Sequence, residues 1–202
     1  MVIPGLTFTW KRVTILGFID LFFLAMHSFY ERGGPMKIIQ LVSDDFEDLE
    51  LWCPVMRLRE EGIQVDLVAE KKGEYTGKYG VHCEATKTFD EVDPGDYDGI
   101  LVPGGWAPDK LRRFPKVLEM VRSMNDDGKL IGEICHAGWV LISAGILNGR
   151  TVTSTPGIKD DMKNAGATWL DEAVVVDGNI ISARRPPDIP EYNRALVEFL
   201  LH

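Results

Sequence analysis

The chain has 202 residues, of which 45% are hydrophobic and 26% are charged, and its formal net charge is −9. This composition is that of an ordinary globular protein, so collagen-like, low-complexity and disordered chains are excluded. The acidic balance disfavours nucleic acid as the main partner, because phosphate binding needs an excess of lysine and arginine.

The three cysteines lie far apart in the sequence and match neither a disulfide framework nor a zinc motif. The HExxH, Walker and GxGxxG patterns are also missing, so we expect no metal and no cofactor. Free thiols of this kind favour a reduced compartment, and we therefore expect a cytoplasmic protein.

Residues 1–35 differ in composition from the rest of the chain. They hold five of the nine phenylalanines, whereas the remaining 167 residues carry a net charge of −10. Their apolar run from Val13 to Met26 contains Asp20 and falls short of the roughly 20 residues that span a bilayer. We expect no stable membrane insertion and a true start at Met36, with residues 1–35 an upstream extension. An accessory or interface segment and an export signal are the alternatives.

From Met36 onward, short apolar runs alternate with helical patterns. In chain order they predict a strand at 36–42, a helix from 49 to Gly62, a strand at 64–69, a hairpin or excursion around 73–80, a strand at 99–102, a helix at 117–126, a strand at 129–134, a helix at 138–144, strands at 151–154, 173–176 and 179–182, and a helix at 191–201. This alternation predicts one α/β domain over residues 36–202, with a parallel sheet covered on both faces.

Three polar or glycine-rich segments follow predicted strands. Residues 44–48 come after the first strand, Pro103-Gly104-Gly105 after the third, and Cys135-His136 after the fourth. In open parallel sheets, ligands bind outside the carboxyl ends of the strands. We therefore expect these three segments to meet at one site.

Cys135 lies between an apolar strand and a helix, which is the context of a nucleophile elbow. The usual G-x-Nuc-x-G pattern is half met, because Ala137 is small but Glu133 replaces the first glycine. The amides at the start of the following helix would favour a thiolate. The alternative is a buried cysteine that serves only as an apolar side chain.

The other candidates each have a structural alternative. His136 is either a catalytic base or a turn residue. Glu47 either shares a proton with the thiol of Cys135 or belongs to an acidic helix N-terminus. Gly104 and Gly105 either let backbone amides approach an oxyanion or form an ordinary turn.

From Met36 to its end, the chain resembles the PfpI family of intracellular cysteine peptidases and deglycases, within the class I glutamine amidotransferase-like superfamily. The resemblance rests on several motifs in the same order, which are Phe46–Leu51, Val102–Asp109, Ile134–His136, Leu141–Gly145, Pro156–Met162 and Val174–Asn179.

The resemblance implies a flavodoxin-like three-layer α/β sandwich with a mostly parallel central sheet. It makes Cys135 the nucleophile, His136 its partner and Glu47 the carboxyl at the thiol. The amides of Gly105 and His136 are the matching oxyanion-hole donors. A third catalytic acid comes from a neighbouring subunit in PfpI-like proteins, and Asp109 matches it here, where the peptidase has Glu. The family therefore implies a homo-oligomer, either a dimer or a hexamer.

Two classes of function remain. The first is a PfpI-like cysteine hydrolase that acts on small carbonyl adducts, in the manner of a deglycase or glyoxalase, or on peptides. The second is a non-enzymatic, redox-sensing stress protein whose Cys135 is oxidised to sulfinic acid. Glutamine amidotransfer is disfavoured, because only His202 follows His136 and the late His-x-Glu pair of those enzymes is missing.

Overall fold

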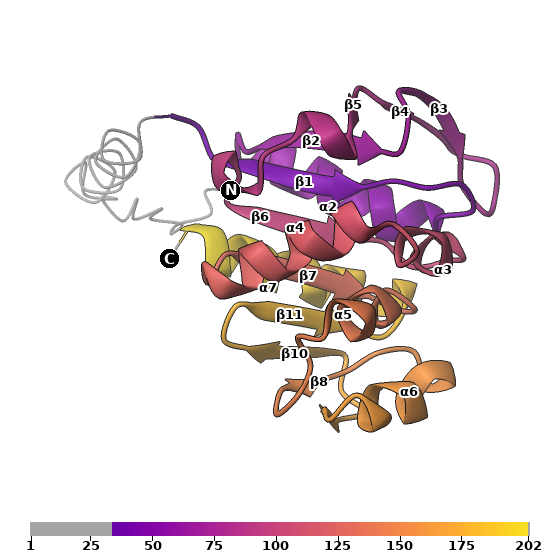
Figure 1. Cartoon of the computed structure of the whole chain (residues 1–202), viewed down its shortest axis with the longest axis vertical. Helices are drawn as coiled ribbons and strands as arrows, with labels where there is room; N and C mark the ends of the chain where they lie inside the picture. The colour runs from indigo at the N-terminus through magenta and orange to yellow at the C-terminus, as the bar shows by residue number, and fades with distance from the viewer. Residues whose placement is uncertain (1–33, 202) are drawn as a thin grey trace, which may run out of the picture. The chain divides into compact units, whose positions relative to one another are not determined.

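In the computed structural model, which describes residues 34–201, seven strands form the central sheet in the order β10-β11-β7-β6-β1-β2-β5 (Figure 1). All neighbouring strands are parallel except β10 and β11, which are antiparallel. The mostly parallel sheet that the sequence predicted is thus confirmed. The strands are β1 (Lys37–Leu41), β2 (Gln64–Ala69), β5 (Lys87–Thr88), β6 (Gly99–Val102), β7 (Leu130–Ile134), β10 (Val174–Asp177) and β11 (Ile180–Ala183).

Helices cover both faces of the sheet, which gives a three-layer sandwich (Figure 1). On one face α2 (Asp48–Glu60) packs beside α7 (Ile189–Leu201), and on the other α4 (Pro115–Asp126) packs beside α5 (Gly138–Ala144). Every residue of β6 and β7 is buried. This explains why the apolar residues of these strands follow one another rather than alternate, with Glu133 in β7 as an exception.

The remaining elements are short. The hairpin predicted around residues 73–80 is formed by β3 (Gly73–Thr76) and β4 (His82–Ala85). The predicted strand at 151–154 is shorter, as β8 (Thr151–Val152), and pairs outside the main sheet with β9 (Thr168–Trp169), which the sequence did not predict. The sequence did not predict two short helices. These are α3 (Ala107–Leu111), which follows β6, and α6 (Lys159–Asn164), which contacts β9.

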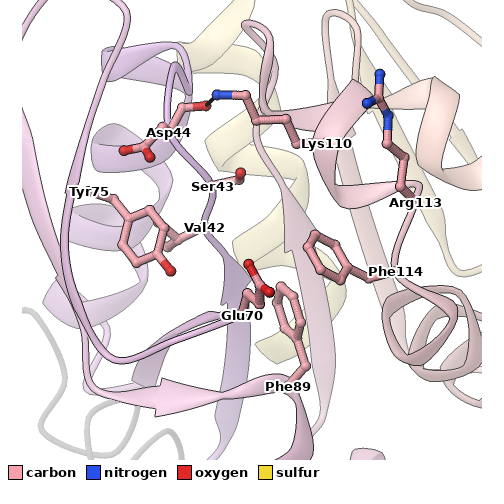
Figure 2. Close-up of a pocket in the computed structure, with 9 residues that line it drawn as sticks. All are labelled: Val42, Ser43, Asp44, Glu70, Tyr75, Phe89, Lys110, Arg113 and Phe114. Atoms are coloured by element: carbon pink, nitrogen blue, oxygen red, sulfur yellow. Dashed lines mark hydrogen bonds between the residues drawn. The ribbon is translucent and has the colours of Figure 1, made fainter.

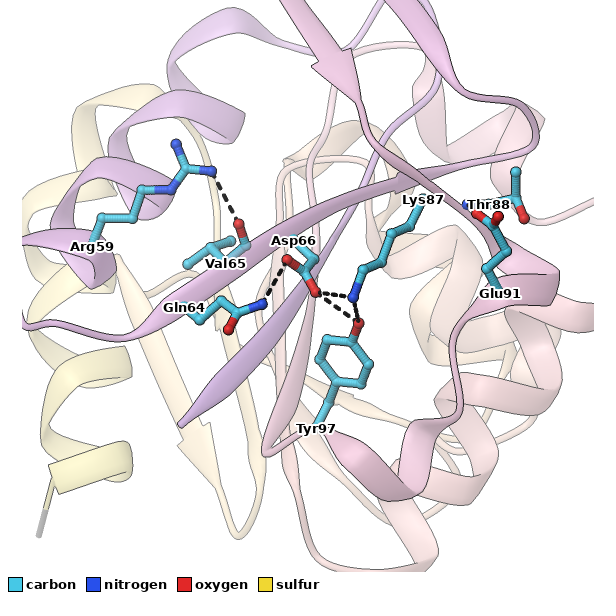
Figure 3. Close-up of polar contacts among 8 residues, drawn as sticks. All are labelled: Arg59, Gln64, Val65, Asp66, Lys87, Thr88, Glu91 and Tyr97. Atoms are coloured by element: carbon cyan, nitrogen blue, oxygen red, sulfur yellow. Dashed lines mark hydrogen bonds and ion pairs between the residues drawn. The ribbon is translucent and has the colours of Figure 1, made fainter. Parts of the chain in front are cut away.

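A polar network holds the edge strand β5 against β2 (Figure 3). The carboxylate of Asp66 accepts hydrogen bonds from Lys87 Nζ at 2.7 Å, from the hydroxyl of Tyr97 at 2.8 Å and from the amide of Gln64 at 3.0 Å. These bonds lower the pKa of Asp66 although burial acts in the opposite direction. The network therefore ties a two-residue strand to the rest of the sheet.

The expected extension at residues 1–35 lies almost wholly outside the described residues and stays a prediction. Across residues 34–201, no helix combines the length and apolar character that a membrane crossing requires.

Candidate active site

The segments that follow β1, β6 and β7 meet at the carboxyl edge of the sheet, as the sequence predicted. Phe46 and Gly105 form an isolated antiparallel bridge. The amide of Glu47 donates to the carbonyl of Gly104 at 3.2 Å, and the amide of Trp106 donates to the carbonyl of Asp45 at 2.8 Å. These backbone bonds fix the loops after β1 and β6 relative to each other.

Cys135 occupies a sharp turn between β7 and α5. Its φ angle is 67°, in the left-handed region that residues with a side chain rarely adopt. The amide of Cys135 donates to Ala183 at 2.9 Å, and its carbonyl accepts from Thr155 at 3.1 Å. The turn is therefore held on both sides, and it presents a half-buried thiol at the edge of the sheet, which is the geometry of a nucleophile elbow.

Three groups predicted from the sequence lie at this sulfur. Nδ1 of His136 is 3.3 Å from Sγ of Cys135. The backbone amides of Gly105 and His136 lie near enough to the sulfur to lower the pKa of the thiol. These amides come from two different loops, so a developing oxyanion beside the sulfur would find two donors already in place.

The carboxyl at the thiol belongs to Glu50, which corrects the expectation for Glu47. Glu50 is 1% exposed and accepts a hydrogen bond from the amide of Gly104 at 2.9 Å, and its carboxyl lies beside Cys135 on the other side of Gly104. Glu47 is instead the N-cap of α2, and its carboxylate accepts the amide of Glu50 at 2.8 Å. Its side chain is directed to the helix end rather than to the sulfur.

The reason for this difference is helical spacing. The buried side of α2 carries Leu51, Pro54 and Leu58, and Glu50 belongs to the same side. A carboxyl on this mostly apolar side is a sequence signal that points to Glu50 and to Asp48, the two buried acids of α2, but not to Glu47.

Gly104 is packed between the two reactive groups. A Cβ at this position would overlap the carboxyl of Glu50 and would lie 2.7 Å from Cβ of Cys135. Only glycine leaves room for the contact between the carboxyl and the thiol.

The carboxyl and the thiol titrate as a coupled pair. Burial, with a smaller effect of Glu47, raises the pKa of Glu50 from 4.5 to about 8. Burial and the charge of Glu50 also raise the pKa of the Cys135 thiol, whereas the amides of Gly105 and His136 lower it. The thiolate expected from the helix position alone is therefore opposed by burial and by the charge of Glu50.

His136 is a neutral imidazole at neutral pH. Burial and the nearby ammonium of Lys78 both lower its pKa from 6.5. The ring is stacked with Trp106 at a centroid distance of 6.2 Å and lies at a tilt against Trp139 at 5.2 Å. Neither tryptophan was singled out from the sequence as part of the site's wall.

Asp109 is not brought to His136 within the chain. It lies on α3, its carboxylate is half-exposed, and it pairs with Arg113 one turn later. A contact between Asp109 and His136 of a neighbouring subunit thus stays a prediction.

Glu133 is a second buried carboxyl, on β7 two residues before the nucleophile. It is 0% exposed, and neither of its carboxyl oxygens has a hydrogen-bond partner among the described residues. Burial and the charge of Glu50 raise its pKa. The residue is thus a neutral acid in the core beneath the site.

A pocket of about 330 Å³ lies beside the site, at the carboxyl ends of β1 and β2 (Figure 2). Its walls include three aromatic rings, Tyr75, Phe89 and Phe114, with Glu70 and Lys110 between them. None of the residues that touch the thiol lines this pocket, so it is separate from the nucleophile. Within residues 34–201, no group of three or more histidine, cysteine or acidic side chains could hold a metal ion.

Comparison with known proteins agrees with this geometry. The pattern described as the DJ-1/PfpI family matches residues 36–199. Deglycase PfpI of Pyrococcus furiosus is 47% identical over 165 residues, which are 82% of this chain and 99% of that protein. Protein/nucleic acid deglycase 2 of Escherichia coli is 37% identical, with 81% and 97% of the two chains covered.

A solved structure has the same fold. It is a two-domain protein of Anabaena variabilis with DJ-1/ThiJ/PfpI-like and ferritin-like domains, and it superposes with a TM-score of 0.80 at 36% identity. The match covers 82% of this chain and 48% of the Anabaena protein.

Proposed function

This chain belongs to the DJ-1/PfpI family, and we propose that it is a cysteine-dependent hydrolase that removes small dicarbonyl adducts from amines and thiols. The observation that supports this most directly is the contact between Glu50 and Cys135, with two backbone amides at the same sulfur. That arrangement supplies a nucleophile, a proton carrier and an oxyanion site within one buried cluster.

In the proposed reaction, the former aldehyde carbon of the adduct releases the amine or thiol, and Sγ of Cys135 adds to the aldehyde that this step frees. The carbonyl oxygen becomes an oxyanion held by the amides of Gly105 and His136. His136, neutral at pH 7, accepts the thiol proton at Nδ1, which is 3.3 Å from the sulfur. Glu50, protonated at neutral pH, gives its proton to the leaving amine or thiol and recovers one from the hydroxyl of the adduct. A proton then moves from the carbon bound to sulfur to the neighbouring ketone carbon, which leaves a thioester that water hydrolyses to the hydroxy acid.

The chemistry balances without an external oxidant or reductant. An adduct of methylglyoxal plus one water gives the free amine or thiol and a hydroxy acid. The aldehyde carbon is oxidised while the neighbouring ketone carbon is reduced. A proton must therefore move between two carbons of the substrate, and a buried carboxyl beside the thiol is suited to carry it.

Peptide hydrolysis is the other activity of a family of this kind, and the same nucleophile would serve it. We favour the small adducts because the thiol is half-buried in a cluster with Glu50 and the ring of His136. Hydroxy acid formation from a methylglyoxal adduct and cleavage of a peptide, each measured with wild type and Cys135→Ser, separate the two activities. Equal rates for both proteins would contradict chemistry at Cys135.

We also propose a homo-oligomer in which Asp109 reaches His136 of a neighbouring subunit, in a cytoplasmic setting. The support is that the Asp109 carboxylate on α3 is half-exposed and that, within residues 34–201, it pairs only with Arg113. All three cysteines are free thiols, which suits a reducing compartment.

The redox-sensor alternative has less support, because oxidation by peroxide follows thiolate character. Burial and Glu50 both raise the pKa of the Cys135 thiol. Mass spectrometry after mild peroxide treatment tests it. Selective oxidation of Cys135 in a protein without turnover would favour the sensor over the enzyme.

A further inference from the structure

The tip of the β3–β4 hairpin is fastened to the start of α2, beside the active site. The carboxylate of Asp48 accepts the amides of Tyr79 at 2.9 Å and of Val81 at 2.8 Å. Asp48 is only 4% exposed. The amide of Lys78 donates to the carbonyl of Phe46 at 2.8 Å. Hydrogen bonds donated to a buried carboxylate thus fix this loop against the helix that carries Glu50.

Gly77 shows how closely the loop is packed. A Cβ on this residue would lie 2.7 Å from the carboxyl carbon of Asp48, so no other residue fits without a shift. On the preceding strand, the amide of Thr76 donates to Asp44 at 3.0 Å. The backbone at Lys78 is therefore held by the fold and is not part of a free loop.

The hairpin tip places the ammonium group of Lys78 beside aromatic side chains at the active site. Nζ of Lys78 lies 6.0 Å from the ring centroid of Trp106 and 5.2 Å from that of Tyr79. The ring of Trp106 is stacked with His136, which contacts the sulfur of Cys135. One continuous series of contacts therefore connects the ammonium to the nucleophile.

Lys78 forms no ion pair within residues 34–201. Lys110, a nearby cation after β6, is neutralised by Asp45. The charge of Lys78 nevertheless acts on the reacting groups, because it lowers the pKa of His136 and opposes the increase at Glu50. The chain has a net charge of −9 and therefore repels anions in general, whereas the positive charge of Lys78 attracts them locally.

We propose that Lys78, held over Trp106 by the hairpin tip, makes the site select substrates that carry a carboxylate. This rests on the proposed function and specifies its substrate class: adducts whose non-reacting part ends in a single negative charge, such as those of free amino acids. One ammonium suits one carboxylate, and the exposed faces of Trp106 and Tyr79 cover the apolar part of the same molecule.

Alkylation of Cys135 tests the selection without any turnover. Iodoacetate and iodoacetamide react alike, since sulfur displaces iodide in both and the thiol proton goes to solvent, but only iodoacetate carries a charge. The two second-order rates are measured at the Cys135 peptide by mass spectrometry in wild type and Lys78→Gln. Lys71→Gln is the matched control, because it removes the same charge just before the base of the same hairpin.

The expected result is that Lys78→Gln lowers the ratio of the iodoacetate rate to the iodoacetamide rate about fivefold. Lys78→Glu lowers it further, and added salt reduces the wild-type ratio. A ratio that stays unchanged in Lys78→Gln, or that falls equally in Lys71→Gln, overturns the role of Lys78.

Turnover separates this inference from the proposed function. The paired substrates are the methylglyoxal hemithioacetals of N-acetylcysteine and of its neutral amide. If wild type prefers the acid and Lys78→Gln loses that preference through KM, the inference holds. If wild type turns over neither substrate, the proposed function fails, and the alkylation ratio still decides whether Lys78 attracts anions to Cys135.

Discussion

The carboxyl of Glu50 lies against the thiol of Cys135, and Gly104 leaves the space in which the two groups meet. Glu47, one helical turn earlier, caps the same helix through the amide of Glu50. Two neighbouring acids on one helix thus have different roles, and substitution can separate them.

Replacing Glu50 by Gln should lower kcat/KM for a methylglyoxal adduct by a factor of about 10² to 10⁴, because a proton carrier at the thiol is lost. Glu47→Gln keeps a capping oxygen and should retain activity within about fivefold, with a stability loss of at most about 1 kcal/mol. Steady-state kinetics and urea unfolding of both variants check this pair. A larger kinetic loss in Glu47→Gln would reverse the assignment.

The stability of the protein should depend on pH through Glu50. Burial raises the pKa of this carboxyl from 4.5 to about 8. Between those values the folded protein keeps a proton that the unfolded chain releases. The free energy of unfolding therefore falls as pH rises through this window.

Glu50→Gln has no proton to lose at this position and so avoids the fall in unfolding free energy with rising pH. Relative to wild type, it should gain of the order of 3 kcal/mol in unfolding free energy between pH 4.5 and pH 8. Glu60→Gln, at the exposed end of the same helix, is the control. If the unfolding free energies of wild type and Glu50→Gln instead changed in parallel with pH, Glu50 would be ionised in the folded protein at neutral pH.

Alkylation of Cys135 by iodoacetamide should still be accelerating above pH 9, because burial and the charge of Glu50 raise the pKa of the thiol from its ordinary value of 9.0. The amides of Gly105 and His136 act in the opposite direction but do not outweigh burial. A rate that has already levelled off by pH 6 would indicate a preformed thiolate and would contradict the raised pKa of the thiol.

Gly104→Ala should abolish most turnover, because the added methyl group overlaps the carboxyl of Glu50 and crowds Cys135. Gly157→Ala is the matched control beside the same site. Its nearest neighbour, Nε2 of His136, would lie at an ordinary 3.9 Å from the new Cβ. Similar activities for the two variants would contradict the packing described for Gly104.

Subunit mixing tests the proposed role of Asp109. If this acid serves the neighbouring subunit, Asp109→Asn and Cys135→Ser should each have little activity alone. Equal mixtures that reassemble at random should regain about one quarter of the wild-type activity, because one pairing in four restores an intact site. A mixture no more active than its parents, or a monomer in sedimentation, would argue against a shared site.

Much of the fold could be predicted from the sequence, since buried parallel strands leave apolar runs and glycines mark the turns between them. The position of Cys135 after β7 was predicted for the same reason. The choice between Glu47 and Glu50 was not, because family position pointed to Glu47 whereas the orientation of α2 decides which acid is buried.

The approach of Lys78 to His136 lies beyond sequence patterns altogether. It depends on Asp48, which fastens a hairpin tip some 30 residues further along the chain to the start of α2. Such a contact depends on tertiary packing and has no period or motif. The short helix α3 was missed for a similar reason, because five residues carry too little periodicity to detect.

The most direct test of the account is the rate at which wild type and Cys135→Ser form hydroxy acid from the hemithioacetal of methylglyoxal and N-acetylcysteine. Hydroxy acid does not arise when the adduct simply dissociates, so its formation reports catalysis. We predict that wild type releases hydroxy acid and free thiol together, and that Cys135→Ser is slower by about a thousandfold or more. Equal rates in the two proteins would contradict a reaction at Cys135.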